Sequence, residues 1–141
     1  NNNPLIIANS DQYIRWNSST TMYNITTKKY DGAILTFKSI HPKWSYVKED
    51  KNDLISEVAE KKVISDKATV GVYYWKHGSD YIKYAKQMIK ENIRVNNEFY
   101  VCPVYNQAIL DKKKIKAIEV EEMMGLGTPE DLNQFLKKNN L

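Results

Sequence analysis

A short apolar run near the start of the chain, followed at once by polar residues, constrains the fold most. Residues 5–8 read Leu-Ile-Ile-Ala, and residues 9–12 read Asn-Ser-Asp-Gln. An unbroken apolar run of this length is typical of a strand covered on both faces. Ligands of open α/β sheets bind at the carboxyl ends of strands, so Asp11 is a candidate metal-binding carboxylate. The alternative is that Asp11 only forms a turn or caps a helix.

The composition is ordinary for one soluble domain. The 141 residues are 42% hydrophobic and 27% charged, with a net charge of +4. Because the aromatic residues lie in apolar stretches rather than among lysines, we expect no nucleic-acid partner. No apolar run approaches the ~20 residues of a membrane span, so we expect no membrane partner. Cys102 is the single cysteine, which excludes an internal disulfide and favours a cytoplasmic location.

Periodicity and turn signals predict an α/β fold with a mixed, mostly parallel sheet and flanking helices. We expect strands at residues 5–8, 33–40, 44–49, 54–61, 68–75 and 114–120. We expect helices at residues 18–27, from a cap at Ser79 to about residue 90, at 96–110 with a kink at Pro103, and from a cap at Thr128 onward. Residues 13–17 and 123–127 are expected to be loops.

Common catalytic and metal-binding motifs are missing from the sequence. His41 and His77, the two histidines, are not at ligand spacing. Cys102 has no neighbouring histidine to act as its base, so we expect a core residue. The glycines at 125 and 127 precede a helix but lack the Lys-Ser/Thr of a phosphate-binding loop.

A series of short segments, taken together, resembles a known enzyme family. The segments are Asn9-Ser10-Asp11-Gln12, Val58-Ala59-Glu60-Lys61, Thr69-Val70-Gly71-Val72-Tyr73, Asn96-Asn97-Glu98-Phe99-Tyr100 and Gly125-Leu126-Gly127-Thr128-Pro129-Glu130-Asp131-Leu132. The series resembles the carboxyl-terminal half of the sugar-phosphate nucleotidylyltransferases, or sugar-nucleotide pyrophosphorylases, and most resembles a branch from capsule and surface-polysaccharide loci. It extends over nearly the whole chain.

The resemblance implies a nucleotide-diphospho-sugar transferase-like fold and a reaction between a nucleoside triphosphate and a sugar 1-phosphate. The implied catalytic residues are Asp11, which would bind Mg²⁺ or Mn²⁺, and Lys61, which would meet the sugar phosphate. The implied substrate-binding residues are Glu60, Gly71, Asn97 and Glu98. Such chemistry depends on charge neutralisation more than on an acid or base.

Two departures from the family pattern limit this prediction. The Gly-rich signature that holds the triphosphate is absent, and Gly125 stands where a second metal-binding aspartate is usual, unless Glu98 or Glu121 replaces it. We therefore expect residues 1–141 to be a single domain, the sugar-phosphate-binding half of a larger one. It would be incomplete at its amino-terminal side and inactive alone. It would form a homo-oligomer or need the missing amino-terminal half.

Other functions remain open. One alternative is a glycosyltransferase-type domain that uses a nucleoside diphospho-sugar, and another is a non-catalytic binding module. Turnover of a nucleoside triphosphate, as opposed to a nucleoside diphospho-sugar, would discriminate between the two enzyme classes.

Overall fold

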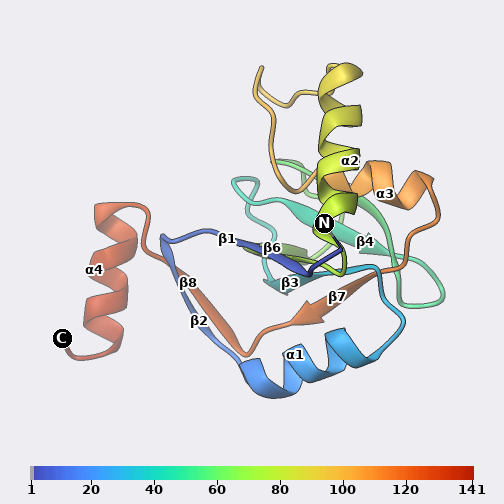
Figure 1. The fold of residues 1–141 in the computed structure, drawn as a ribbon. Coiled ribbons are helices and arrows are strands. Elements are labelled where there is room, and N and C mark those ends of the chain that lie inside the picture. The colour runs from blue at the N-terminus through green and yellow to red at the C-terminus, as the bar shows by residue number, and fades with distance from the viewer. Residues whose placement is uncertain (1) are drawn as a thin grey trace.

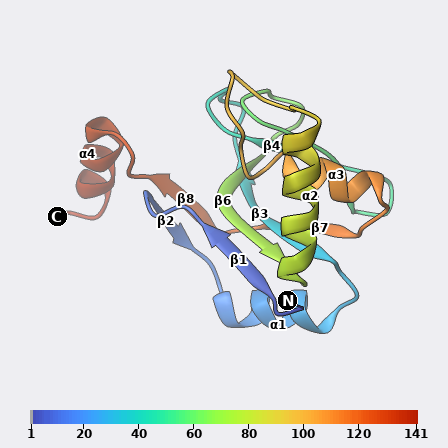
Figure 2. The same ribbon diagram turned by 45° about the horizontal axis from the view of Figure 1, so that its top comes forward.

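The computed structural model describes residues 2–141 and shows a sheet with helices on both faces (Figures 1 and 2). The strands are β1 (Leu5–Ala8), β2 (Gln12–Arg15), β3 (Gly32–Lys38), β4 (Tyr46–Glu49), β5 (Ile55–Ala59), β6 (Lys67–Trp75), β7 (Ile115–Glu119) and β8 (Glu122–Gly125). The helices are α1 (Ser18–Thr27), α2 (Gly78–Lys90), α3 (Val104–Leu110) and α4 (Pro129–Lys138). No helix within residues 2–141 is long and apolar enough to span a bilayer.

The main sheet is mixed, and most of its pairings are antiparallel. Its strand order is β5-β4-β6-β3-β7, and β1 pairs with β6 outside this path. Among the pairings within residues 2–141, only that of β3 with β7 is parallel. The predicted α/β fold with a mixed sheet and flanking helices is confirmed, but the prediction that this sheet is mostly parallel is wrong. The prediction failed because an apolar pattern indicates which side chains of a strand are buried. It does not indicate whether the neighbouring strand runs parallel or antiparallel to it.

β6 has different neighbours along its two halves. On one side it pairs with β3, with one shift in register. On the other side it pairs with β4 at Ala68 and with β1 at residues 72–75. Gly71 lies between these two neighbours, so the end of β1 and the start of β4 diverge there. We call this gap the fork.

The main hydrophobic core lies between one face of the sheet and helices α2 and α3. Trp75 of β6 stacks on Tyr105 of α3 with ring centroids 4.1 Å apart, and Tyr84 of α2 lies 6.2 Å from the same indole. The Tyr105 hydroxyl donates to the carbonyl oxygen of Tyr74 at 2.8 Å. Burial of each such aromatic side chain stabilises the fold by about 2 kcal/mol, which fixes both helices against β6.

The opposite face of the sheet is covered by α1. Ile25 of α1 packs against Ala33 and Tyr74 in a second, smaller cluster. The Asn17 side chain accepts a hydrogen bond from the backbone N–H of Thr20, which satisfies one unpaired donor at the helix start. The helix predicted at residues 18–27 is therefore confirmed.

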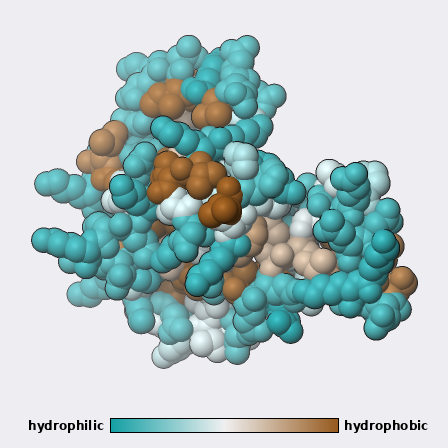
Figure 3. Space-filling view, turned by 180° about the vertical axis from the view of Figure 1, so that it is seen from behind, coloured by the Kyte–Doolittle hydropathy of each residue, from teal (hydrophilic) through white to brown (hydrophobic). Residues whose placement is uncertain are grey.

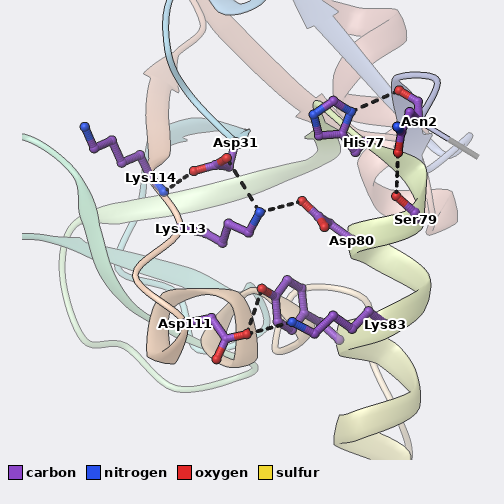
Figure 4. A network of polar contacts seen from close by, with 10 residues as sticks. Asn2, Asp31, His77, Ser79, Asp80, Lys83, Asp111, Lys113 and Lys114 are labelled. Carbon is purple, nitrogen blue, oxygen red and sulfur yellow. Dashed lines mark hydrogen bonds and ion pairs between the residues drawn. The ribbon is translucent and has the colours of Figure 1, made fainter.

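Ion pairs connect α2 to the turn that follows α3 (Figure 4). Lys113 Nζ lies 3.0 Å from Asp80 Oδ2. Lys83 Nζ donates to Asp111 Oδ2 at 2.9 Å, and the Tyr84 hydroxyl donates to the same oxygen at 3.0 Å. Partly exposed pairs of this kind contribute little singly, but several together hold the helix in one register on the sheet.

A two-stranded ribbon of β2 and β8 carries α4 to one side of the main sheet (Figure 1). Tyr13 of β2 packs on Phe135 of α4, with ring centroids 5.2 Å apart. The prediction that residues 13–17 and 123–127 are loops is wrong for most of these positions. Each strand of the ribbon is four residues long, which is too short for periodicity to reveal it.

β1 forms at the predicted residues but lies at an edge. Within residues 2–141 it pairs only with β6, and the Ile6 side chain is 49% exposed. The prediction that this strand is covered on both faces is therefore wrong for the described chain. Apolar side chains also reach the surface elsewhere, and the space-filling view shows brown patches between hydrophilic regions (Figure 3).

Two helices start at positions other than those predicted. α3 begins at Val104 rather than at residue 96, because Asn96 and Asn97 have φ angles of 47° and 65°. These angles belong to a tight turn and interrupt a helix. Pro103 directly precedes α3, at a position where its missing N–H removes no helical hydrogen bond. The chain therefore starts a helix after Pro103 instead of kinking a longer helix there, as was predicted. α2 begins at Gly78, one residue before the predicted cap.

Candidate functional site

The fork contains a cavity of about 340 Å³. We call it the fork pocket. One wall comes from the end of β1, the opposite wall from the start of β4 and the loop before α3, and β6 forms its floor. The lining residues are Asn9, Gln12, Lys43, Trp44, Ser45, Glu60, Thr69, Val70, Gly71, Tyr73, Tyr100, Val101 and Cys102.

Gly71 brings two backbone segments close together at the fork. Its φ is +78°, a conformation that residues with a Cβ rarely adopt. An ideal Cβ at this position would lie 2.4 Å from Asn9 Nδ2. The backbone N–H of Asn9 donates to the Gly71 carbonyl oxygen at 2.9 Å, which joins one wall of the fork pocket to its floor. Glycine is therefore required here for backbone conformation and for space.

Hydroxyl groups form the inner wall of the fork pocket. Ser45 Oγ lies 2.5 Å from Thr69 Oγ1, which lies 3.2 Å from the Tyr73 hydroxyl. Cys102 is 1% exposed beside them, and burial raises the pKa of its thiol to about 12. A thiol with this pKa is no nucleophile near neutral pH, so the prediction that Cys102 is a core residue agrees with its burial.

Glu60 contributes a carboxylate to the fork pocket. It follows directly after β5, and partial burial raises its pKa, while the neighbouring Lys61 ammonium opposes that rise. A partly desolvated carboxylate is a strong hydrogen-bond acceptor for a ligand hydroxyl group. Its position suits the recognition of a polyhydroxylated ligand.

Lys61 lies at the rim of the fork pocket, next to Tyr100. Its ammonium donates to the Tyr100 hydroxyl at 2.7 Å, and that hydroxyl donates to Glu98 Oε2 at 2.7 Å. The hydrogen bond to Tyr100 is the main reason that the pKa of Lys61 is raised. The lysine is therefore a cation near neutral pH and could pair with an anionic ligand at the rim.

A second hollow of about 280 Å³ adjoins the fork pocket and contains Asp11. We call it the carboxylate hollow. Its residues are Asn9, Asp11, Gln12, Lys43, Trp44, Gly125, Gly127, Thr128 and Asp131. A Cβ on Gly127 would lie 2.9 Å from Asp11 Oδ2, and one on Gly125 would lie 3.4 Å from Asp131 Oδ2. The two glycines thus leave room for two carboxylates on one wall.

Lys43 and Trp44 separate the two cavities and line both. The Lys43 ammonium lies 4.7 Å from the Trp44 ring centroid and 3.9 Å from Asp131 Oδ1. An ammonium group at this place can meet an anion that bridges the two cavities. Lys43 and Trp44 were missed in the sequence because no local motif marks them, and Tyr100 and Asp131, although they lie within the quoted segments, were not selected as site residues.

Some of the predicted site residues lie together, and others lie apart. Asp11 lines the carboxylate hollow, Glu60 and Gly71 line the fork pocket, and Lys61 lies at the rim. Asn97 lines neither cavity, and its carbonyl oxygen accepts from Arg94 at 3.2 Å. Substrate binding by Asn97 stays a prediction without support from this arrangement.

The carboxylate nearest to Gly125 is not one of those proposed from the sequence as a replacement. Glu98 is bonded to Tyr100, and Glu121 pairs with Arg15 at 3.5 Å, whereas Asp131 lies against Gly125. Across residues 2–141, no group of three or more His, Cys, Asp and Glu side chains could hold a metal ion. Two carboxylates are still enough for Mg²⁺, which commonly takes only one or two from the protein.

Comparison with known proteins identifies the fold. No protein-family model matches the chain, and no curated protein matches it. Among solved structures, a nucleoside-diphosphate-sugar pyrophosphorylase from Vibrio cholerae RC9 superimposes with a TM-score of 0.79 and 21% sequence identity, over 95% of this chain and 56% of that one.

A putative glucose-1-phosphate thymidylyltransferase from Bacillus anthracis, in complex with a sucrose, gives a TM-score of 0.72 and 18% identity, over 94% of this chain and 53% of that one. The chain spans about half the length of both structures. It therefore has the same fold as these two proteins over the part that it covers.

Proposed function

We propose that this chain is the acceptor-binding part of a nucleotidyltransferase that transfers a nucleotidyl group from a nucleoside triphosphate to a sugar 1-phosphate or a similar phosphorylated acceptor. The observation that carries the proposal is the pair of adjoining cavities at the fork. One contains Glu60 above a hydroxyl-rich wall, and the other contains Asp11 and Asp131. Both lie in a fold shared with sugar nucleotidyltransferases.

The lining of the fork pocket suits the two parts of a sugar phosphate. Glu60 would accept hydrogen bonds from sugar hydroxyl groups, and Gly71 would let the Asn9 side chain lie against β6, where it lines the same pocket. Lys61 at the rim and Lys43 between the cavities would neutralise phosphate charge. Transfer of this kind depends mainly on positioning and charge neutralisation, so the site needs no general base.

The carboxylate hollow fits Mg²⁺ or Mn²⁺. Oxygen ligands suit these hard cations, and the absence of side chains at Gly125 and Gly127 leaves space beside both carboxylates. Asp11 and Asp131 would hold the ion. When bound, the ion would neutralise charge on the phosphate oxygens. Asp131 would take the place of the aspartate that position 125 lacks.

A further part of the fold would complete the enzyme. The chain covers about half of each solved structure, and the free edge of β1 lies next to the cavities. We propose that a triphosphate-binding half packs on this edge, as part of a longer polypeptide or as a partner, or that two copies of the chain associate there. A cytoplasmic location and a role in polysaccharide synthesis belong to this proposal.

Ligand binding to the chain tests the proposal directly. Backbone NMR spectra of the labelled chain would be recorded with α-D-glucose 1-phosphate, with dTTP and with UDP-glucose, each with Mg²⁺. We expect glucose 1-phosphate to shift the signals of Gly71, Glu60 and Lys61 at millimolar concentration. A parallel assay would measure pyrophosphate release from the chain alone, where we expect no turnover.

The same spectra separate this function from its rivals. A preference for UDP-glucose at Gly71 and Glu60, with hydrolysis or transfer of the sugar, would favour a glycosyltransferase-type domain. No shift at the fork pocket with any of the three ligands would contradict the proposed function and favour a non-catalytic module.

A further inference from the structure

Tyr100 joins two loops at the rim of the fork pocket through one hydroxyl group. That hydroxyl accepts a hydrogen bond from Lys61 Nζ at 2.7 Å and donates one to Glu98 Oε2 at 2.7 Å. The Lys61 ammonium also lies 4.8 Å from the centroid of the same ring. Of the ion pairs among residues 2–141, none joins Lys61 directly to Glu98. The phenol is therefore the link between the two charges.

The backbone at both ends of this link is held in place. Lys61 has a φ of 53°, and its backbone N–H donates to the carbonyl oxygen of Trp44 at 3.1 Å. Glu98 exchanges two backbone hydrogen bonds of 2.9 Å with Val95 in a tight turn. With both backbones fixed, the remaining freedom lies in the long lysine side chain, and the hydroxyl of Tyr100 removes much of it.

Resting on the function proposed above, we propose that Tyr100 is a positioning residue that, together with Glu98, holds the ammonium of Lys61 at the rim of the fork pocket to receive the acceptor's phosphate. The three side chains form the hydrogen-bonded series Glu98–Tyr100–Lys61. Glu98 then acts through Tyr100 rather than by touching the acceptor.

Each side chain in this hydrogen-bonded series has a separate role. Glu98 accepts the hydrogen bond from the phenolic O–H, so the lone pairs of the Tyr100 oxygen are left to face Lys61. Lys61 donates one N–H to Tyr100 and keeps two others for an incoming anion. Since Tyr100 also lines the fork pocket, a ligand in that pocket would lie beside the held cation. The raised pKa of Lys61 agrees with this arrangement.

The test follows the Lys61 ammonium itself. The chain would be labelled with ¹³C- and ¹⁵N-lysine, which leaves all three N–H donors in place, and the Lys61 Cε and Nζ signals would be assigned by their loss in Lys61→Arg. The pKa of Lys61 and the affinity for inorganic phosphate would then be measured for the unaltered chain, Tyr100→Phe and Glu98→Gln. Tyr23→Phe is the matched control because its side chain is 69% exposed.

We expect the pKa of Lys61 to fall in Tyr100→Phe and, less strongly, in Glu98→Gln. We expect phosphate to bind about three- to tenfold more weakly to Tyr100→Phe, the range that one hydrogen bond supports. The control should change neither quantity. We expect unchanged melting temperatures for the tyrosine variants, because a Tyr→Phe change removes only the hydroxyl group. Unchanged melting temperatures would show that the variants fold.

The outcomes separate this inference from the function on which it rests. An unchanged Lys61 pKa in Tyr100→Phe, with phosphate still shifting the Lys61 signal, would overturn the role of Tyr100 and keep the proposed function. A lowered pKa with no phosphate effect on Lys61 in any variant would overturn both, because Tyr100 would then be a structural contact alone.

Discussion

Gly71 and Asn9 approach so closely that a Cβ on the glycine would lie 2.4 Å from Asn9 Nδ2. This contact joins the two strands that form the floor and one wall of the fork pocket. We expect Gly71→Ala to lower the free energy of unfolding by about 1–3 kcal/mol, because alanine is strained at a φ of +78° and must displace Asn9. Urea denaturation would measure the change.

Gly78→Ala is the control for this substitution. A Cβ at Gly78 would meet no atom closer than 3.4 Å, so we expect at most a small change. If Gly71→Ala were as stable as Gly78→Ala and bound glucose 1-phosphate equally well, the fork would not depend on this glycine.

The carboxylate hollow predicts a weak metal site. We expect Mn²⁺, followed by electron paramagnetic resonance, to bind the chain no more tightly than millimolar, because only Asp11 and Asp131 would serve as charged ligands. Asp11→Asn and Asp131→Asn should each weaken binding by about tenfold, close to the effect of removing one favourable charge interaction.

Glu130→Gln is a suitable control because Glu130 lies in the same helix and lines neither cavity. Binding at micromolar concentration, or a site that survives both aspartate substitutions, would show that other groups hold the ion.

The ion pair of Lys83 with Asp111 predicts a dependence of stability on acid pH. The hydrogen bond from Lys83 lowers the pKa of Asp111 from its ordinary value of 3.8. A carboxyl group whose pKa is lower in the folded state than in the unfolded state stabilises the fold fully when the pH is above its unfolded-state pKa. That stabilisation is lost as the pH falls through its folded-state pKa.

We therefore expect Asp111→Asn to reduce the loss of stability between about pH 5 and pH 2, as measured by thermal denaturation. Glu57→Gln, a substitution of an exposed acid on β5, serves as the control. Parallel pH profiles for the unaltered chain and Asp111→Asn would show that the ion pair contributes nothing.

The free edge of β1 predicts association. Ile6 is 49% exposed on an edge strand beside an apolar groove lined by Trp16, Met22 and Val72. Such edges pair with other chains, so we expect the isolated chain to self-associate at low micromolar concentration in sedimentation experiments. Ile6→Lys should shift the equilibrium toward monomer.

Ile40→Lys provides the comparison, because Ile40 is 77% exposed on a loop away from β1. A single monomeric species, for the unaltered chain and both variants, would contradict the incomplete-fold reading and favour a domain that closes its own core.

Much of the secondary structure could be predicted from local patterns. The strand at residues 5–8 and the strand ending at Trp75 form where the apolar runs predict them, and the helix at 18–27 forms at its predicted residues although its apolar pattern is weak. The direction of strand pairing could not be predicted, because it depends on which segments meet in space. The left-handed conformations of Asn96 and Asn97 also leave no strong local signal, so the helix was predicted too early.

The candidate site was predictable only in part. Asp11, Glu60 and Gly71 could be selected from a series of segments in order, and the fold places them at adjoining cavities. Lys43 could not, because its importance comes from spatial neighbours rather than from spacing, and Asp131 lies in the last of these segments but was not selected from it. The carboxylate that lies against Gly125 is six residues further along the chain, on a different element.

The change of neighbours along β6 gives the molecule a modular binding surface. The wall that carries Asn9 and Gln12 follows β1, whereas the wall that carries Lys43 and Ser45 precedes β4, and both walls lie against β6. A change in the β4–β5 hairpin would therefore alter one wall of the fork pocket while leaving β1 and the segment that carries Asp11 unchanged in sequence. Because each wall belongs to a separate element, the shared strand β6 is the position at which a single substitution, such as Gly71→Ala, would disturb both walls together.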